Sequence, residues 1–415
     1  MSTSNRKRGI LGFFRRKQHS ESPVTALAVA GSSATASAES ANVSGSVNSA
    51  AALRGLRNAS DELNDYFQST DGRDASLGNV VEKSRWVEKA QACSNSSFAQ
   101  CSLIEVPHET SRRQLLRLAA LSAVKVYARE GTQHLISSEF DEVGSPLKID
   151  ADLLGGSVKA TTTVLYAPRE DGANSSNVIV VAIRGSVTTH DWMVNLNDGA
   201  EWPVEDTFLG TDTEGGFYNA HAGFLTCAKA MNVTVVDQIY GQLCASKHTA
   251  GAGSKPTLLF TGHSAGGAVA AMLYAHFLKC DPVSDDREKS LVLKSAFSSV
   301  HCITFGAPPI TTKPVVPFQG GSIFLSIVNN GDPVPRADNA YIHSLLRLFS
   351  GPIPEKGAVY ALPARRFFNA GQVLVALPRG TLLIPNESGA GSLSETVMGD
   401  IRAHKMVEYR RRIEL

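Results

Sequence analysis

The feature that most constrains the fold of this 415-residue chain is the stretch "TLLFTGHSAGGAVAAMLYAHFL", residues 257–278. Its first part is an apolar run that follows Pro256 and is long enough for one buried strand of a parallel sheet. Its last part is rich in alanine, with larger apolar residues, and this composition predicts a helix that lies close to the sheet. Between them, residues 262–266 have the pattern G-x-S-x-G, in which glycines let strand and helix approach each other. The stretch therefore predicts an α/β fold in which a tight turn presents Ser264.

The predicted position of Ser264 suits a nucleophile. Such a turn projects the serine hydroxyl at the carboxyl end of the sheet, beside the backbone N–H groups that begin the helix, where an oxyanion is stabilised. The alternative interpretation is a glycine-rich turn that binds nothing. A serine is a weak nucleophile by itself, so the nucleophile interpretation requires an acid and then a histidine further along the chain.

Asp332 is the predicted acid. An apolar run, residues 323–328, leads into Asn-Asn-Gly-Asp-Pro, which places Asp332 just past the carboxyl end of a strand. If this strand is parallel to the one before Ser264 and neighbours it, both side chains lie at the same edge of the sheet. Asp338 is the rival acid, deeper in the loop, and the alternative for Asp332 is an Asp-Pro turn residue.

Two histidines, His343 and His404, follow the strand of the predicted acid. His404 lies at the start of a predicted terminal helix in "MGDIRAHKMVEYRRRIEL", from which a histidine can reach back over the sheet. The alternative for His404 is a partly exposed helical histidine among basic residues. His343 precedes "SLLRLF" and is predicted to be structural. It is therefore ranked after His404, as the second candidate base. Four apolar residues of the terminal helix are expected to pack inward: Met406, Val407, Tyr409 and Ile413.

In four separate stretches the chain from Arg113 onward resembles the class 3 lipases, the fungal-type lipase family of the α/β-hydrolase superfamily. The stretches are "VIVVAIRGSVTTHDWMVNL", "AHAGF", "TGHSAGGAVA", and "NNGDPVPR" taken together with "AHKMVEYRRRI". Their joint order is more specific than any one of them. The resemblance implies a catalytic triad of Ser264, Asp332 and His404, and an oxyanion hole of Ser186 and the N–H of Ala265.

The residues before Ser186 favour the same role for it. Residues 178–183 form a continuous apolar run rich in β-branched side chains, as expected for a strand buried on both faces. The run ends in Arg184-Gly185-Ser186, where the glycine lets the backbone approach a ligand and the serine can offer an N–H and a hydroxyl to an oxyanion. The alternative is a strand-to-loop turn capped by serine.

The segment that follows Ser186, residues 187–197, is interpreted as a lid. Trp192 and Met193, with two further apolar residues, would otherwise be ordinary core residues. Beside a candidate oxyanion residue they are typical of the apolar face of a short lid helix. His221, in the "AHAGF" stretch, is assigned no catalytic step.

The composition excludes several classes of protein. A formal net charge of +1 gives no basic field for nucleic acid, and no apolar run reaches the ~18 residues needed for a membrane span. Hydrophobic residues make up 43% of the chain, which is ample for one sizeable core. No cofactor or metal is expected, and the cysteines lack metal-ligand spacing, so we interpret them as reduced, buried thiols. They are Cys93, Cys101, Cys227, Cys244, Cys280 and Cys302.

We divide the chain into a leader that is basic, then low in complexity and predicted to be disordered (1–60), a partly helical extension (61–110) and an α/β-hydrolase domain (111–415). Helices are expected near residues 80–92 and 111–130. The basic start of the leader surrounds an apolar core of about six residues, shorter than the ~7–15 of a secretory signal. It suits an anionic membrane surface or a mitochondrial presequence. We therefore expect an intracellular protein, cytoplasmic or peripheral on a membrane or lipid-droplet surface, with mitochondria as the alternative.

The sequence thus predicts an α/β-hydrolase fold, with a mostly parallel sheet and helices on both faces. The predicted function is a serine carboxylic-ester hydrolase that acts on acylglycerol lipids, as a triacylglycerol or diacylglycerol lipase, through an acyl-enzyme. The expected partner is a lipid ester substrate at a membrane or lipid-droplet surface, and no oligomeric state is indicated. Phospholipase A1 and a general esterase are the alternatives on the same triad. A hydrolase-like binding module without activity is the alternative from a different class.

Overall fold

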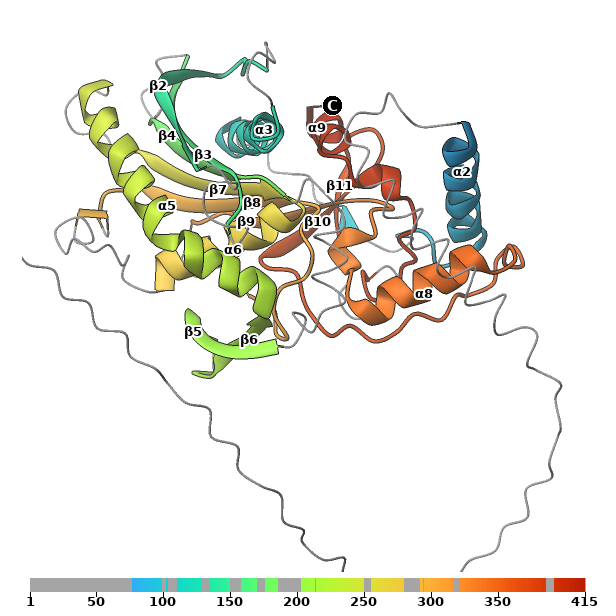
Figure 1. The fold of residues 1–415 in the computed structure, drawn as a ribbon. Helices are drawn as coiled ribbons and strands as arrows, with labels where there is room; N and C mark the ends of the chain where they lie inside the picture. Colours follow the sequence, from blue (N-terminus) through green and yellow to red (C-terminus); the bar gives the residue numbers. More distant parts are fainter. Residues whose placement is uncertain are drawn as a thin grey trace, which may run out of the picture. The chain divides into compact units, whose positions relative to one another are not determined.

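The computed structural model describes most of the chain from residue 77 onward (Figure 1). The described residues are 77–98, 102–103, 110–128, 135–149, 158–169, 176–185, 203–212, 214–249, 255–279, 292–293, 295–315, 321–385 and 392–414. All of them lie in the second of the two units into which the chain divides, Met1–Val47 and Asn48–Leu415. The predicted leader lies outside the described residues, and the three-part division of the chain stays a prediction.

The described strands form one large sheet in the order β1-β11-β10-β9-β8-β7-β4-β3-β2. Five adjacent strands, β10, β9, β8, β7 and β4, run parallel to one another, while the strands at both edges pair antiparallel. The bounds are β1 Ser102–Leu103, β2 Phe140–Ile149, β3 Thr161–Pro168, β4 Val178–Ile183, β7 Thr257–His263, β8 Ser299–Phe305, β9 Phe324–Asn329, β10 Gln372–Ala376 and β11 Leu382–Ile384. A separate pair is formed by β5 (Pro203–Thr211) and β6 (Phe217–His221).

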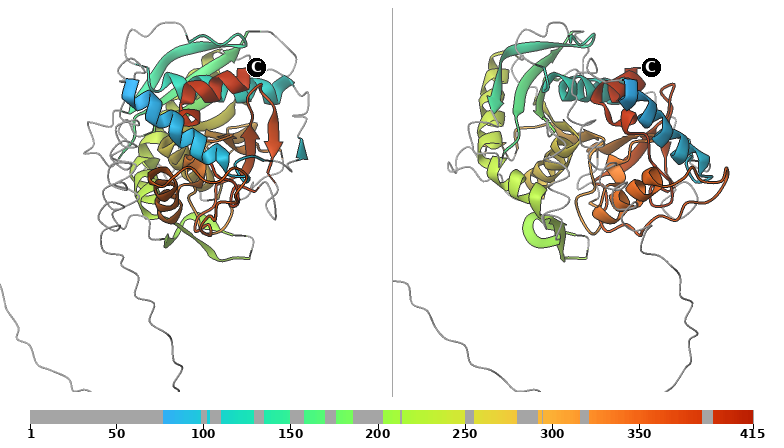
Figure 2. Two further views of the ribbon diagram at one scale, coloured as in Figure 1. Left: turned by 90° about the vertical axis from the view of Figure 1, so that its right-hand side faces the viewer. Right: turned by 45° about the vertical axis from the view of Figure 1, so that its right-hand side comes forward.

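Helices cover both faces of the large sheet. The helices α3 (Thr110–Lys125) and α9 (Met406–Glu414) lie on one side, and α5 (Ala222–Thr249) and α6 (Ala265–Lys279) lie on the other (Figure 2). The remaining elements are α2 (Leu77–Ala92), α8 (Asn339–Ser350) and the short 3-10 helices η2 (Val334–Arg336) and η3 (Ile401–His404). The predicted fold class, a mostly parallel sheet between helices, is therefore confirmed.

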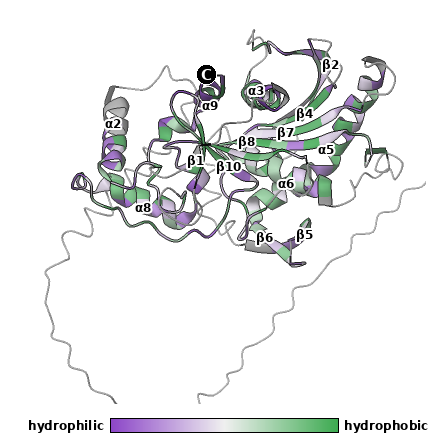
Figure 3. Ribbon diagram, turned by 180° about the vertical axis from the view of Figure 1, so that it is seen from behind, coloured by the Kyte–Doolittle hydropathy of each residue, from purple (hydrophilic) through white to green (hydrophobic). Residues whose placement is uncertain are grey.

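The central strands are apolar on both faces because both faces are covered. In β7, Leu258 and Phe260 pack in the cluster with α5 and α6, whereas Leu259 between them packs in the cluster with α3 and α9. All seven residues of β7 are buried, and Figure 3 shows that the central strands are mainly hydrophobic. Successive side chains of a strand point to opposite faces, so a continuous apolar run is required here rather than an alternating one.

Several predicted elements match the structure closely. The run at residues 178–183 is β4, the run before Ser264 is β7, and the two expected N-terminal helices are α2 and α3. The strand before Asp332, β9, is parallel to β7, as the placement of Asp332 required, but β8 lies between the two strands, so they are not neighbours. Among the described helices, none is both long and apolar enough to cross a membrane.

The prediction for the terminal helix was wrong in one respect. His404 ends η3, and α9 begins at Met406 after a break at Lys405. Met406 and Tyr409 are buried, but Val407 is 62% exposed. The break sets the rotation of α9, and the position after Met406 is turned about 100° away from the face that Met406 and Tyr409 share.

Candidate active site

Ser264 lies in a strained turn between β7 and α6. Its φ of 56° is in the left-handed region, which side chains other than glycine rarely adopt. A Cβ on Gly266 would lie 2.2 Å from the carbonyl oxygen of Ile183, and one on Gly262 would lie 2.6 Å from the carbonyl oxygen of Gly266. Glycine is therefore required at both positions, as the G-x-S-x-G pattern predicted. The N–H of Ser264 donates to the carbonyl of Phe305 at 2.9 Å, which ties the turn to the end of β8.

Asp332 and His404 are brought together although they lie far apart in the sequence. Nδ1 of His404 is 2.9 Å from Oδ2 of Asp332, whose side chain is fully buried just past the end of β9. Oδ1 of Asp332 accepts the N–H of Val334 at 2.9 Å, and Oδ2 also accepts the hydroxyl of Tyr409 at 2.5 Å. A buried carboxylate needs such partners, and here every one of them is a donor.

Ser264 lies at the same edge of the sheet as this pair. The imidazole of His263, the residue before Ser264, lies with its ring centre 4.6 Å from that of His404, and its Nε2 is 2.6 Å from the carbonyl oxygen of His404. The carboxyl end of β8 is equally close to the pair, because a Cβ on Gly306 would lie 2.9 Å from Oδ2 of Asp332. The structure therefore places Ser264, Asp332 and His404 at the carboxyl ends of β7, β8 and β9.

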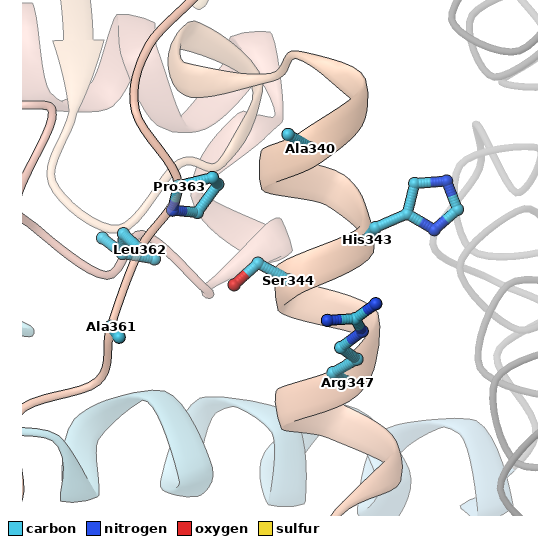
Figure 4. Close-up of a pocket in the computed structure, with 7 residues that line it drawn as sticks. All are labelled: Ala340, His343, Ser344, Arg347, Ala361, Leu362 and Pro363. Atoms are coloured by element: carbon cyan, nitrogen blue, oxygen red, sulfur yellow. The ribbon is translucent and has the colours of Figure 1, made fainter. Parts of the chain in front are cut away.

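The rival acid and the rival base have other surroundings. Asp338 caps the N-terminus of α8, where its side chain accepts the N–H of Tyr341 at 2.9 Å, and its other oxygen is 3.5 Å from the guanidinium of Arg336. His343 is exposed on α8 beside a pocket of about 590 Å³, and its imidazole points away from the segment at residues 361–363 (Figure 4). Neither residue takes part in the hydrogen bonds that join Asp332, His404 and the residue before Ser264.

The predicted oxyanion residues are only partly within the described chain. Ala265 is the first residue of α6 and is fully buried. Ser186 and the predicted lid, including Trp192 and Met193, lie outside the described residues. Gly185 is described, and a Cβ there would lie 3.1 Å from Cβ of Ser264. The end of β4 therefore approaches the serine closely, as an oxyanion donor after Gly185 would require.

Sequence reasoning missed the contribution of Tyr409 and gave no role to Tyr127. Tyr409 was predicted as a core residue and is buried, but its hydroxyl also reaches Asp332, and its local sequence gives no signal for this contact. Tyr127 follows α3 and contacts His263, with nothing in its local sequence to indicate the contact. His221, to which no step was assigned, is buried against Phe224 and Phe367, and burial lowers its pKa to about 4.

The cysteines within the described residues are free thiols. They are Cys93, Cys227, Cys244 and Cys302. Burial raises the pKa of the Cys302 thiol well above its usual value, so this cysteine is held in its neutral form. Cys101 and Cys280 lie outside the described residues.

Comparison with known proteins finds a family match in the central part of the chain. Residues 180–341 match the family model described as lipase (class 3). The matched residues include Ser264 and Asp332 and end before His404, so the position of His404 rests on the geometry given above. The comparison with curated proteins gave no match.

Solved structures that resemble this chain are lipases at low sequence identity. The native Rhizomucor miehei lipase propeptide complex is 15% identical, with a TM-score of 0.42, over 77% of this chain and 85% of that one. The nonglycosylated Lip2 lipase of Yarrowia lipolytica is 12% identical, with a TM-score of 0.42, over 75% of this chain and 96% of that one. A triacylglycerol lipase from Penicillium expansum is 13% identical, with a TM-score of 0.36, over 72% and 99%.

Proposed function

We propose that this chain, a serine ester hydrolase of the class 3 lipase type, cleaves the carboxylic esters of acylglycerol lipids through an acyl-enzyme on Ser264. One observation carries the proposal. The hydrogen-bonded pair of Asp332 and His404 lies beside a serine that is held at a φ of 56° in a strand-to-helix turn. A base oriented by a buried acid, next to a serine in such a turn, is the arrangement that activates a hydroxyl for attack on a carbonyl.

The bond between His404 and Asp332 fixes which nitrogen of the imidazole acts as the base. A carboxylate only accepts hydrogen bonds, so Nδ1 of His404 carries a proton and donates a hydrogen bond to Asp332. In the neutral ring this leaves a lone pair on Nε2, which can accept the proton of Ser264. Once His404 is protonated, the buried charge of Asp332 stabilises the imidazolium without itself taking the proton.

The reaction has two halves. The oxygen of Ser264 attacks the ester carbonyl as its proton passes to His404, and the oxyanion accepts hydrogen bonds from the N–H of Ala265 and from Ser186. The intermediate then expels the alcohol, which takes the proton from His404, and the acyl group remains on Ser264. Water, deprotonated by His404, attacks the acyl-enzyme, and the bond between the acyl group and Ser264 then breaks as the serine oxygen takes the proton back from His404, which releases the fatty acid.

The choice of an acylglycerol substrate is supported by the class 3 lipase match and by the apolar segment at residues 187–197. We infer that this segment is a lid that covers the acyl pocket and opens at a lipid surface. The basic leader would strengthen binding to that surface by electrostatic attraction to anionic lipids. Burying or exposing one large apolar side chain is worth about 1.5–3 kcal/mol, so contact with lipid can shift the equilibrium of such a lid.

The experiment is hydrolysis of a substrate panel by the full chain, with fatty-acid release as the readout. The panel contains emulsified triacylglycerol and diacylglycerol, monoacylglycerol, phosphatidylcholine vesicles and a short soluble ester. The proposal predicts the fastest release from emulsified acylglycerols. Preferential release from the first acyl position of the phospholipid would point to a phospholipase A1. Equal rates on soluble and emulsified esters would point to a general esterase.

A further inference from the structure

A chain of hydrogen bonds passes beneath Ser264 and joins three separate parts of the candidate active site. The N–H of Gly185 donates to the hydroxyl oxygen of Tyr127 at 2.9 Å, and this hydroxyl is 3.0 Å from Nδ1 of His263. Nε2 of His263 is 2.6 Å from the carbonyl oxygen of His404. This series of hydrogen bonds, which we call the Tyr127–His263 relay, therefore runs from the end of β4, through the residue before Ser264, to the backbone of the candidate base.

Each donor and acceptor in this chain is determined by its partner. A carbonyl oxygen only accepts, so Nε2 of His263 must carry a proton. Burial, and then the neighbouring His404, holds the pKa of His263 well below its usual range, so the ring is neutral and Nδ1 has a lone pair. Burial raises the pKa of Tyr127, so its hydroxyl stays protonated and donates a hydrogen bond to Nδ1. The hydroxyl oxygen of Tyr127 then accepts the hydrogen bond from the N–H of Gly185. Each polar group in this series of hydrogen bonds therefore has a partner.

The neutral state of His263 affects the candidate base, His404, as well as the hydrogen bonds that His263 makes. The rings of His263 and His404 are tilted against each other, with 4.6 Å between their centres and 34° between their planes. A charged His263 at this distance would oppose the formation of the His404 imidazolium that the reaction requires. Because His263 uses both nitrogens in hydrogen bonds, it has no lone pair left to accept the proton of Ser264.

We propose that Tyr127 and His263 are positioning residues that hold the end of β4, the nucleophile turn and the backbone of His404 in catalytic register. This inference rests on the proposed function, because it concerns the geometry of the same site. Neither residue touches the substrate in this account. Tyr127 acts through Gly185 and His263, and His263 acts through the carbonyl of His404.

The first test is the substitution Tyr127→Phe, which removes one hydroxyl and keeps the ring. The N–H of Gly185 and Nδ1 of His263 then lose their partner. We expect kcat for a short soluble ester to fall roughly 10- to 100-fold, because small misplacements of reacting groups have effects of that size. KM should change by less than about threefold, since ground-state binding of the ester is not involved. The rate of covalent labelling by a fluorophosphonate should fall in parallel with kcat.

The matched control is Tyr166→Phe. Tyr166 is also a buried tyrosine that donates its hydroxyl, here to Glu142 at 3.2 Å, but it pairs with Val178 at the opposite end of β4 from Gly185. Its substitution should lower thermal stability to a similar extent while leaving kcat within about twofold of the wild type. The comparison separates loss of register at the active site from a general loss of stability.

A double-mutant cycle tests the link between the two residues. In His263→Gln, the side-chain amide N–H can still reach the carbonyl of His404, whereas in His263→Leu neither the bond to His404 nor the bond from Tyr127 can form. We expect His263→Gln to keep more activity than His263→Leu, and we expect Tyr127→Phe to have a smaller effect on kcat in the Leu background than in the wild type.

The outcomes distinguish this inference from the proposed function. If the wild-type protein is not labelled by the fluorophosphonate and hydrolyses no ester, the proposed function is wrong, and the inference about Tyr127 and His263 is wrong with it. If the wild type is active and folded Tyr127→Phe has the kcat of Tyr166→Phe, the relay inference is wrong while the hydrolase stands. If the effects of Tyr127→Phe and His263→Leu on kcat are fully additive, the hydrogen bond between the two residues does not couple them, and the inference is wrong.

Discussion

The hydroxyl of Tyr409 lies 2.5 Å from Oδ2 of Asp332, the same carboxylate oxygen that lies 2.9 Å from Nδ1 of His404. Tyr409 also accepts the N–H of Asn329 at 2.9 Å, so its hydroxyl joins the end of β9 to the acid. Burial, and then the charge of Asp332, holds the pKa of Tyr409 well above its usual value, which keeps this hydroxyl a donor. The orientation of the acid is therefore set from α9, the helix that follows His404 itself.

Removal of the hydroxyl in Tyr409→Phe is expected to lower both activity and stability. Asp332 loses one donor and the N–H of Asn329 loses its acceptor, and a buried group left without a partner costs about 1–3 kcal/mol. We expect the free energy of unfolding in urea to fall by that amount and kcat to fall roughly 10-fold. A variant with wild-type kcat would show that His404 and the remaining bond to Val334 orient Asp332 without help from Tyr409.

The two candidate histidines should behave differently when replaced by alanine. His404→Ala removes the base and should lower kcat roughly 10⁴-fold, as loss of a triad member does in serine hydrolases. His343→Ala should leave kcat within about twofold, because His343 is exposed on α8 and has no part in the bonds around Asp332. Kinetics with a soluble ester measure both. A large loss in His343→Ala with an active His404→Ala would move the base to α8 and contradict the geometry.

Gly266, two residues after the candidate nucleophile Ser264, should tolerate no side chain. In Gly266→Ala the new Cβ would lie 2.2 Å from the carbonyl oxygen of Ile183, so β4 and α6 must move apart. We expect a loss of at least about 3 kcal/mol in the free energy of unfolding. Gly216→Ala is the control, because its Cβ would meet its nearest neighbour, a carboxylate oxygen of Asp212, at an ordinary 3.5 Å. Equal stability of the two variants would mean that strand and helix are not in close contact at the turn.

Stability should fall as the pH drops from about 6.5 to about 4. Burial lowers the pKa of both His221 and His301 from 6.5 to about 4, so they stay neutral in the folded protein while the unfolded chain takes up protons. The unfolded state then binds more protons in this window, and each histidine contributes a slope on the order of 1.4 kcal/mol per pH unit. The stabilising effect is complete above pH 6.5 and is lost as the pH approaches 4.

The variant His221→Leu tests this pH dependence directly. Both ring nitrogens of His221 lack a hydrogen-bond partner among the described residues, so leucine removes the titration without breaking a bond. Urea unfolding at several values between pH 4.5 and 7.5 should give a shallower slope for the variant than for the wild type. The same slope in both proteins would mean that His221 is not held neutral by the fold.

The parts of the site that follow local sequence rules could be predicted. The apolar run of β7, the small residues around Ser264 and the alanine-rich start of α6 define the turn, because each is required by close packing of strand and helix. Asp332 could be placed because a polar residue directly after a buried strand lies at the carboxyl edge of the sheet. These predictions needed only the order of elements along the chain.

The parts of the site that depend on distant contacts could not be predicted. Tyr127 and His263 lie 136 positions apart in the chain, and their contact depends on where α3 ends relative to β7. The misplacement of Val407 has a different origin, because the spacing of Met406 and Tyr409 in a helix already turns Val407 away from the face that they share. Contacts such as that of Tyr127 with His263 depend on tertiary packing, whereas sequence periodicity reports only which face of an element is apolar.

The central claim is that Ser264 is the nucleophile, and covalent labelling of the full chain by a fluorophosphonate tests it most directly. The account predicts that the wild type is labelled at Ser264, as identified by mass spectrometry of the peptide, and that labelling abolishes ester hydrolysis. Ser264→Ala should fold normally, because alanine fits the turn, but should take no label and lose roughly 10⁴-fold or more in kcat. A wild-type chain that hydrolyses esters but is labelled elsewhere, or a folded Ser264→Ala with near-normal turnover, would contradict it.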